Sequence, residues 1–156
     1  MKRRLTMGVV LTLALAGTVT VVIRATPAIG FISAAILARG ALTTPIHAHS
    51  DKIVLLAQQP TDHVVQRIVW GAGSSSGWHR HPGVVLVTVQ SGTLVFYDSD
   101  CVAQTFTTGQ SFWESGKRAG LVRNETTADA TVYATYIVPA GAPLRIDLPN
   151  PGCLED

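Results

Sequence analysis

The stretch GAGSSSGWHRHPGVVLVTVQSG, residues 71–92, carries the strongest structural signal in the chain. A loop rich in glycine and serine is followed by two histidines one residue apart, His79 and His81, and then by an alternating apolar run that closes at Ser91 and Gly92. Side chains at positions i and i+2 of a strand leave the same face. Both imidazoles are therefore expected to point the same way, an arrangement that suits a metal ion.

Short β-rich segments dominate the sequence after Asp51. Val, Ile, Thr and aromatic residues fill them, and Gly, Ser, Asp, Asn or Pro separates them. The strands predicted here cover residues 52–57, 63–70, 84–90, 93–97, 102–107, 110–114, 120–124 and 131–138. This spacing predicts a β-sandwich or barrel with no helix, and with a hairpin that turns at residues 90–92.

The first 25 residues have the pattern of an export signal. Basic residues at positions 2–4 precede an uncharged apolar run at 7–23. A small-x-small pattern at residues 14–16 offers one cleavage site, and a cut after Ala25, which would use the full apolar run, offers another. The alternative is an uncleaved signal anchor, because the run approaches the lower limit for a membrane span. We expect a secreted or cell-envelope protein that contacts a membrane only if this segment is retained.

Charge argues against a nucleic-acid partner. The formal net charge is +2, but four of the twelve Lys and Arg residues lie in residues 1–25, and the first acidic residue is Asp51. The rest of the chain has eight basic and ten acidic residues, a net charge of −2. No basic cluster remains that could follow a phosphate backbone.

Two cysteines, Cys101 and Cys153, lie in the part expected to be exported. An even pair in an oxidising compartment favours a disulfide, with two unrelated thiols as the alternative. We expect four segments: a signal peptide at 1–25, a strand and connection at 26–51, a barrel at 52–140, and a tail at 141–156. The tail is rich in Pro and Gly, and a disulfide would hold it against the outside of the barrel.

Two motifs in this order resemble those of the cupin superfamily. Residues 73–92, with His79 and His81, match G-x5-H-x-H-x3,4-E-x6-G, and residues 109–124 resemble G-x5-P-x-G-x2-H-x3-N. The stretches GWHxHPG, SGTL, ATY and PAG are similar to those of small exported cupin-domain proteins of actinobacteria. The resemblance covers roughly residues 52–139. It implies an all-β fold, the cupin double-stranded β-helix or jelly-roll barrel.

The metal motif is degenerate in this sequence. Val85 stands at the glutamate position of the first motif, and Gly120 stands at the histidine position of the second. Of the four ligands that the resemblance implies, His79 and His81 remain, and two imidazoles alone bind a divalent transition metal weakly. Glu114 is the nearest carboxylate by motif alignment.

Other residues have a functional and a structural interpretation. Five aromatic residues could line a pocket at the barrel mouth or pack in the core: Trp78, Tyr97, Trp113, Tyr133 and Tyr136. Three basic residues could receive an anionic ligand or form a solvated face: Lys117, Arg118 and Arg123. His47 and His49 repeat the spacing of the motif histidines in a connection bounded by proline, which favours a solvated loop.

The sequence thus predicts an exported cupin-domain protein that takes a small molecule in the barrel and binds a metal weakly, without assured catalysis. One alternative is a metal-dependent cupin enzyme of the oxygenase or isomerase type, whose third ligand the motifs do not identify. Another is a structural envelope protein that works through its surface. A homodimer joined through barrel edges is compatible with each of these.

Overall fold

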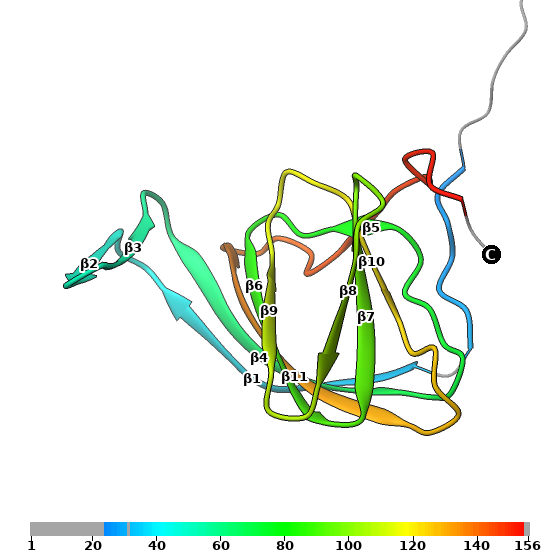
Figure 1. The fold of residues 1–156 in the computed structure, drawn as a ribbon. Coiled ribbons are helices and arrows are strands. Elements are labelled where there is room, and N and C mark those ends of the chain that lie inside the picture. The colour runs from blue at the N-terminus through cyan, green and yellow to red at the C-terminus, as the bar shows by residue number, and fades with distance from the viewer. Residues whose placement is uncertain (1–23, 31, 155–156) are drawn as a thin grey trace, which may run out of the picture.

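Two five-stranded antiparallel sheets face each other in the structure, a computed structural model that describes residues 24–30 and 32–154 (Figure 1). The first sheet has the order β1-β4-β11-β6-β9. Its strands are β1 (Ile32–Leu42), β4 (Thr61–Trp70), β11 (Ala130–Pro139), β6 (Val84–Ser91) and β9 (Ser111–Glu114). The described residues contain no helix, as the sequence predicts.

The second sheet has the order β12-β5-β10-β7-β8. Its strands are β12 (Ile146–Asp147), β5 (His79–Arg80), β10 (Gly120–Arg123), β7 (Thr93–Asp98) and β8 (Ala103–Thr107). The chain passes repeatedly from one sheet to the other, so the core of the barrel lies between them (Figure 1).

The alternation in β6 shows how sequence pattern produces this core. Val85, Val87 and Val89 are buried, whereas Val84 and Leu86 between them are exposed on the outer face. Successive side chains of a strand point to opposite faces, so one run supplies both a core and a surface. The strand continues into β7 through Gly92, as the sequence predicts, at a φ of 84°. A Cβ there would lie 2.8 Å from the Cβ of Ala130, which leaves room only for glycine.

Asn124 joins the end of β4 to the loop before β11. Its side chain is fully buried, and Nδ2 donates hydrogen bonds to the carbonyls of Trp70 at 3.0 Å, Gly71 at 3.1 Å and Ala128 at 2.8 Å. Because buried carbonyls need such donors, this one amide fixes the position of Trp70 at the edge of the core.

The N-terminal region departs from the sequence prediction. The predicted connection contains β2 (Ile46–Ser50), which pairs with β3 (Ile53–Ala57) in a separate two-stranded sheet. This hairpin projects away from the barrel (Figure 1). The prediction of a loop at His47 and His49 was wrong, because the chain turns back at Asp51, at a φ of 50°, and residues 46–50 pair with residues 53–57.

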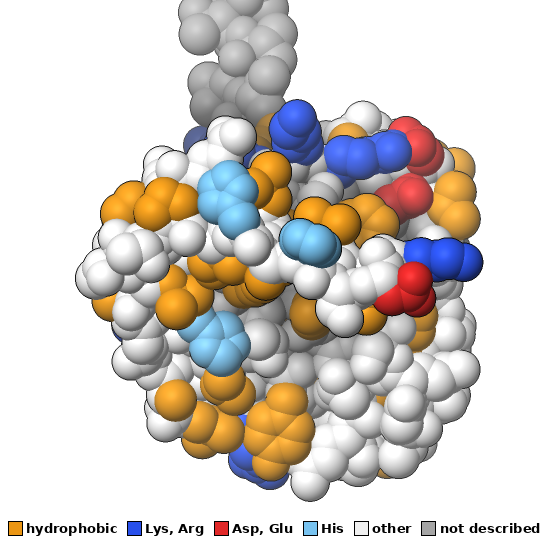
Figure 2. Space-filling model, turned by 90° about the vertical axis from the view of Figure 1, so that its left-hand side faces the viewer, with side chains coloured by type: hydrophobic (Ala, Val, Ile, Leu, Met, Phe, Trp, Pro, Cys, Tyr) orange, Lys and Arg blue, Asp and Glu red, His pale blue; other side chains and the backbone are white. Residues whose placement is uncertain are grey.

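Exposed apolar side chains lie on this hairpin and on the outer face of the first sheet. Ile53 is 76% exposed, Val54 73%, Leu86 52% and Trp113 65%. Figure 2, which looks onto the hairpin end, shows hydrophobic side chains distributed over this face among polar groups and histidines. A shallow groove lined by β3 and by the near ends of β6 and β11 joins the two regions.

The C-terminal tail does more than cover the outside of the barrel. The predicted disulfide between Cys101 and Cys153 is present, with a Cα–Cα distance of 5.5 Å. Between it and β11, however, the tail forms β12, which pairs with β5 and brings Leu144 and Arg145 to the barrel interior. The prediction that the tail only covers the outside of the barrel is therefore wrong. The proline and glycine content of the tail does not indicate the short edge strand β12.

The predicted signal peptide lies almost wholly outside the described residues. Within residues 24–30 and 32–154, no helix is long and apolar enough to cross a membrane. The disulfide hints at a location outside the cytoplasm, since such bonds persist in oxidising compartments.

Replacing both cysteines with serine should lower the free energy of unfolding by about 2–4 kcal/mol, because the unfolded chain would lose a long covalent loop. Chemical denaturation monitored by tryptophan fluorescence measures this change. The reduced parent should behave like the Cys101→Ser/Cys153→Ser variant. Equal unfolding midpoints for the oxidised parent and the variant would contradict the expectation.

Candidate metal centre and cavity

His79 and His81 lie inside the barrel, on the face that their i, i+2 spacing predicts. Each is 5% exposed, and their rings meet edge to face with centroids 4.9 Å apart. Nδ1 of His79 lies 3.0 Å from the carbonyl oxygen of Gly77, and Nδ1 of His81 lies 2.5 Å from that of Leu144. A carbonyl can only accept, so each ring donates from Nδ1 and turns Nε2 toward the interior.

Glu114 completes the cluster from a neighbouring strand. Strands β6 and β9 are paired so that Glu114 stands directly opposite Val85, the position where the first motif lacks its glutamate. Oε2 of Glu114 lies 2.6 Å from Nε2 of His81 and 3.6 Å from Nε2 of His79. One ligand atom from each of the three residues lies within 4.8 Å of the others. Glu114 on β9 thus supplies the carboxylate that the motif lacks at Val85 on β6.

Gly120 also faces the interior but offers no ligand. It is paired with His79, and a Cβ at this position would lie 2.7 Å from Cε2 of Phe96. The Phe96 ring, stacked on Phe112 with centroids 5.4 Å apart, occupies the space beside Gly120. A histidine substituted at Gly120 therefore has no room unless Phe96 moves.

Burial and mutual contacts set the charges of the cluster. Burial lowers the pKa of His79 to about 4 against the partly opposing effect of Glu114, so His79 is neutral at pH 7. Burial alone would raise the pKa of Glu114, but the hydrogen bond from His81 and the nearby His79 outweigh it and hold the pKa below its ordinary value. The site therefore presents a carboxylate and a neutral imidazole at neutral pH.

These residues fit a divalent transition metal. Two imidazole nitrogens and one carboxylate oxygen converge, and the backbone carbonyls of Gly77 and Leu144 hold both rings with Nε2 toward the common point. Hydrogen bonds of this kind commonly orient metal-binding histidines. Donor sets of two histidines and one carboxylate hold zinc or iron(II) in many proteins and leave further positions open.

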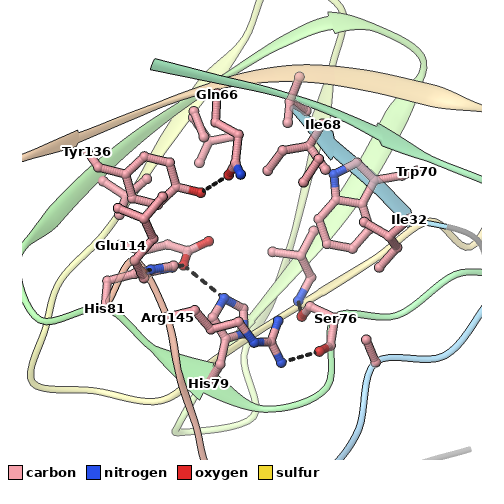
Figure 3. A pocket seen from close by; sticks show the side chains of 18 of the residues that line it. Ile32, Gln66, Ile68, Trp70, Ser76, His79, His81, Glu114, Tyr136 and Arg145 are labelled. Atoms are coloured by element: carbon pink, nitrogen blue, oxygen red, sulfur yellow. Dashed lines mark hydrogen bonds and ion pairs between the residues drawn. The ribbon is translucent and has the colours of Figure 1, made fainter. Parts of the chain in front are cut away.

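A cavity of about 410 Å³ adjoins the cluster and runs between the sheets. Its walls are mainly apolar and include Ile68, Val87, Leu94, Phe112, Val122 and Val132. Figure 3 shows His79, His81, Glu114, Tyr136 and Arg145 around one side of the space, with Trp70 and Ile32 on the other. A cavity of this size and composition suits a small organic molecule.

Tyr136 and Gln66 form a second polar group on the wall. The Tyr136 hydroxyl donates a 2.8 Å hydrogen bond to Oε1 of Gln66, and the Tyr136 ring packs against His81 with centroids 5.6 Å apart. Burial, and then the charge of Glu114, raise the pKa of Tyr136. The hydroxyl therefore stays protonated and acts as a donor.

The structure separates the residues that we nominated from sequence. Of the five aromatic candidates, only Tyr136 lines the main cavity, and Trp113 is largely exposed on the outer surface. Arg118 lies outside the cavity and pairs with Asp100 on the surface. His47 and His49 are exposed on β2, away from the cluster.

Sequence reasoning missed Trp70 and Arg145, which both line the cavity. Trp70 ends an ordinary apolar strand, and Arg145 lies in the tail, so neither forms part of a motif. Only the alternation in β4, which places Gln66, Ile68 and Trp70 on one face, could have pointed to Trp70.

The metal-free protein should lose stability as the pH falls. The unfolded chain takes up a proton at His79 near pH 6.5, whereas the folded chain resists it until about pH 4. The unfolded state binds more protons in this window, so the free energy of unfolding should fall by about 3 kcal/mol as the pH is lowered through it. Urea denaturation at a series of pH values in the presence of a chelator measures the slope of the unfolding free energy against pH.

The His79→Gln variant should show a shallower slope over the same window. The matched control is His47→Gln, which changes an exposed histidine on the projecting hairpin. A parent whose stability is unchanged between about pH 6.5 and pH 4 would contradict this assignment.

Comparison with solved structures shows what the fold is similar to. No family model and no curated protein matches the chain. A solved structure of a conserved protein with a double-stranded β-helix domain from Klebsiella pneumoniae aligns with a TM-score of 0.50 at 16% identity, over 67% of this chain and 84% of that one.

A second similar structure is a cupin 2 conserved barrel domain protein from Leptotrichia buccalis. It aligns with a TM-score of 0.50 at 18% identity, over 69% of this chain and 41% of that one. At such identities the likeness shows the fold alone. The described chain therefore has the cupin double-stranded β-helix fold.

Proposed function

We propose that this protein is a metal-dependent cupin enzyme that holds one divalent transition metal on His79, His81 and Glu114 and acts on a small organic molecule in the adjoining cavity. The observation that carries the proposal is the position of Glu114 opposite Val85. It brings a third ligand atom to two preoriented histidines. The motif alone predicts that two imidazoles bind a metal weakly. With Glu114 as a third ligand, we expect the metal to bind tightly.

The donor set and the cavity favour catalysis over a purely structural role. Three protein ligands leave coordination positions open, and the cavity lies beside them. When bound, the metal would supply Lewis-acid chemistry, or oxygen chemistry if it is iron(II). An enzyme of the oxygenase or isomerase type fits this arrangement, whereas a structural envelope protein would need neither the buried ligands nor the cavity.

The chain's own side chains have definable tasks in such a site. His79 and His81 present Nε2 because their Nδ1 atoms donate to Gly77 and Leu144. The apolar walls exclude water from the bound molecule, which strengthens polar interactions within the cavity. Tyr136, held by Gln66, offers a hydroxyl beside His81 that can orient a polar group of that molecule.

We further propose that the protein acts after export, in the cell envelope or outside the cell. The charged and apolar pattern of residues 1–25 and the disulfide Cys101–Cys153 support this location. The absence of a basic cluster after that segment speaks against a nucleic-acid partner.

Metal titration of chelator-treated protein tests the proposal. Isothermal titration with Zn²⁺ should give one site per chain with submicromolar affinity, and Glu114→Gln should weaken binding by about 10–100-fold. The matched control is Glu125→Gln, which alters an exposed carboxylate hydrogen-bonded to Tyr97. Weak binding by the parent, or equal binding by Glu114→Gln, would contradict the proposed centre.

A transposition variant tests the role of strand register. Val85→Glu/Glu114→Val moves the carboxylate back to the motif position while keeping the same pair of residue types. Because both positions face the interior and lie directly opposite each other, the double variant should regain much of the affinity that Glu114→Val alone loses. Binding by the double variant as weak as that by Glu114→Val would show that the two positions are not equivalent.

A homodimer is proposed from the exposed apolar surface. An isolated two-stranded hairpin is only marginally stable in water, and β3 exposes Ile53 and Val54 while the outer face of β6 exposes Leu86. In a two-fold dimer the hairpin of each copy would cover the sheet face of the other.

Light scattering after size exclusion should give twice the mass of one chain. Val54→Lys and Leu86→Lys should each shift the protein toward the monomer, whereas Thr105→Lys, on an exposed site of β8, should leave the dimer intact. A monomeric parent at all concentrations would contradict this interface.

A further inference from the structure

Trp70, which lines the cavity, has a buried hydrogen-bond donor without a partner among the described residues. The residue is 6% exposed, and among the described residues no atom accepts a hydrogen bond from its indole Nε1. Figure 3 shows the nitrogen-bearing edge of the ring at the cavity, on the opposite side from Glu114. A buried donor without a partner is costly, so its position in the wall of a cavity points to an acceptor supplied by a bound molecule.

Arg145 places a cation on the same cavity. Its Nε donates to Oδ1 of Asp147, and Nη2 donates to the carbonyl oxygen of Ser76 at 2.5 Å. These two contacts fix the guanidinium beside His79 (Figure 3). Among the described residues, Nη1 has no hydrogen-bond partner, so it remains available to a ligand.

A bound divalent metal would make the charges around the cavity favour an anion. Asp147 faces solvent more than Arg145 does, with side-chain exposures of 55% and 33%, and the two offset each other. A divalent cation on Glu114 would leave a net positive charge at this end of the cavity, which a single carboxylate would balance.

We propose that the cavity binds an apolar carboxylic acid whose carboxylate pairs with Arg145 and whose far end carries a hydrogen-bond acceptor, such as an ether or carbonyl oxygen, for Nε1 of Trp70. The inference rests on the proposed function in placing the small molecule in this cavity, and it adds the chemical class. Trp70 and Arg145 then determine specificity, one at each end. The apolar walls between them select a hydrocarbon or aromatic body of moderate size.

Three synthetic probes separate the two contacts. The first is para-methoxyhydrocinnamate, which has a carboxylate, an apolar ring and an ether oxygen. In para-ethylhydrocinnamate a methylene replaces the ether oxygen, and in para-methoxyhydrocinnamamide a neutral amide replaces the carboxylate. Isothermal titration of each probe into chelator-treated protein gives the two preferences without any variant.

The parent should bind the methoxy acid about threefold to tenfold more tightly than the ethyl acid, as expected for one satisfied hydrogen bond. It should also bind the methoxy acid more tightly than the amide, because the carboxylate would accept a charge-assisted hydrogen bond from Arg145. Equal affinities within either pair, or no binding of the methoxy acid at millimolar concentration, would overturn the proposal.

Two variants assign each preference to its residue. Trp70→Phe should abolish the preference for methoxy over ethyl and retain the preference for acid over amide, and Arg145→Gln should do the reverse. Trp113→Phe and Arg118→Gln are matched controls outside the main cavity and should retain both preferences. Loss of both preferences in one variant that still folds, judged by its melting temperature, would contradict separate roles.

Repeating the titrations with Zn²⁺ distinguishes this proposal from the metal proposal. A bound cation should increase the preference for the acid over the amide beyond its metal-free value. If zinc neither binds nor changes the preference, the metal centre is contradicted while the roles of Trp70 and Arg145 stand. If zinc binds but the metal-free preferences are absent, the metal centre stands and the ligand class is wrong.

Discussion

The pairing of β6 with β9 is the constraint on which the site depends. It sets Glu114 opposite Val85, and directly opposed residues of a sheet share a face. The carboxylate of Glu114 therefore lies beside the position at which the sequence motif has valine in place of glutamate. A shift of one residue in this register would turn Glu114 to the outer surface and Trp113 into the barrel. The backbone hydrogen bonds of two strands thus decide whether the two histidines have a third partner.

Hydrogen bonds hold the buried cluster in place in the barrel. His79 and His81 donate to backbone carbonyls, and Glu114 accepts from His81, so no full charge is left alone in an apolar interior. The wall of the adjoining cavity differs, because Nε1 of Trp70 has no hydrogen-bond partner among the described residues. Satisfied groups orient the proposed metal site, and unsatisfied ones indicate what a ligand must supply.

Much of the barrel follows from local sequence. Alternation in residues 84–90 and the glycine turn at Gly92 predict the β6–β7 hairpin, and the spacing of His79 and His81 predicts that both point inward. Glu114 could be nominated only by alignment, because register between strands that are distant in sequence has no local signature. The turn at Asp51 and the role of Arg145 were missed for a related reason, since both depend on contacts that composition does not reveal.

Anomalous diffraction from crystals loaded with Zn²⁺ tests the central claim most directly. We expect a single strong peak at about 2.0–2.2 Å from Nε2 of His79, Nε2 of His81 and Oε2 of Glu114. Two results would contradict the account. One is a peak held by the two histidines with Glu114 turned away, and the other is the absence of a peak at this cluster in crystals that bind zinc at another site.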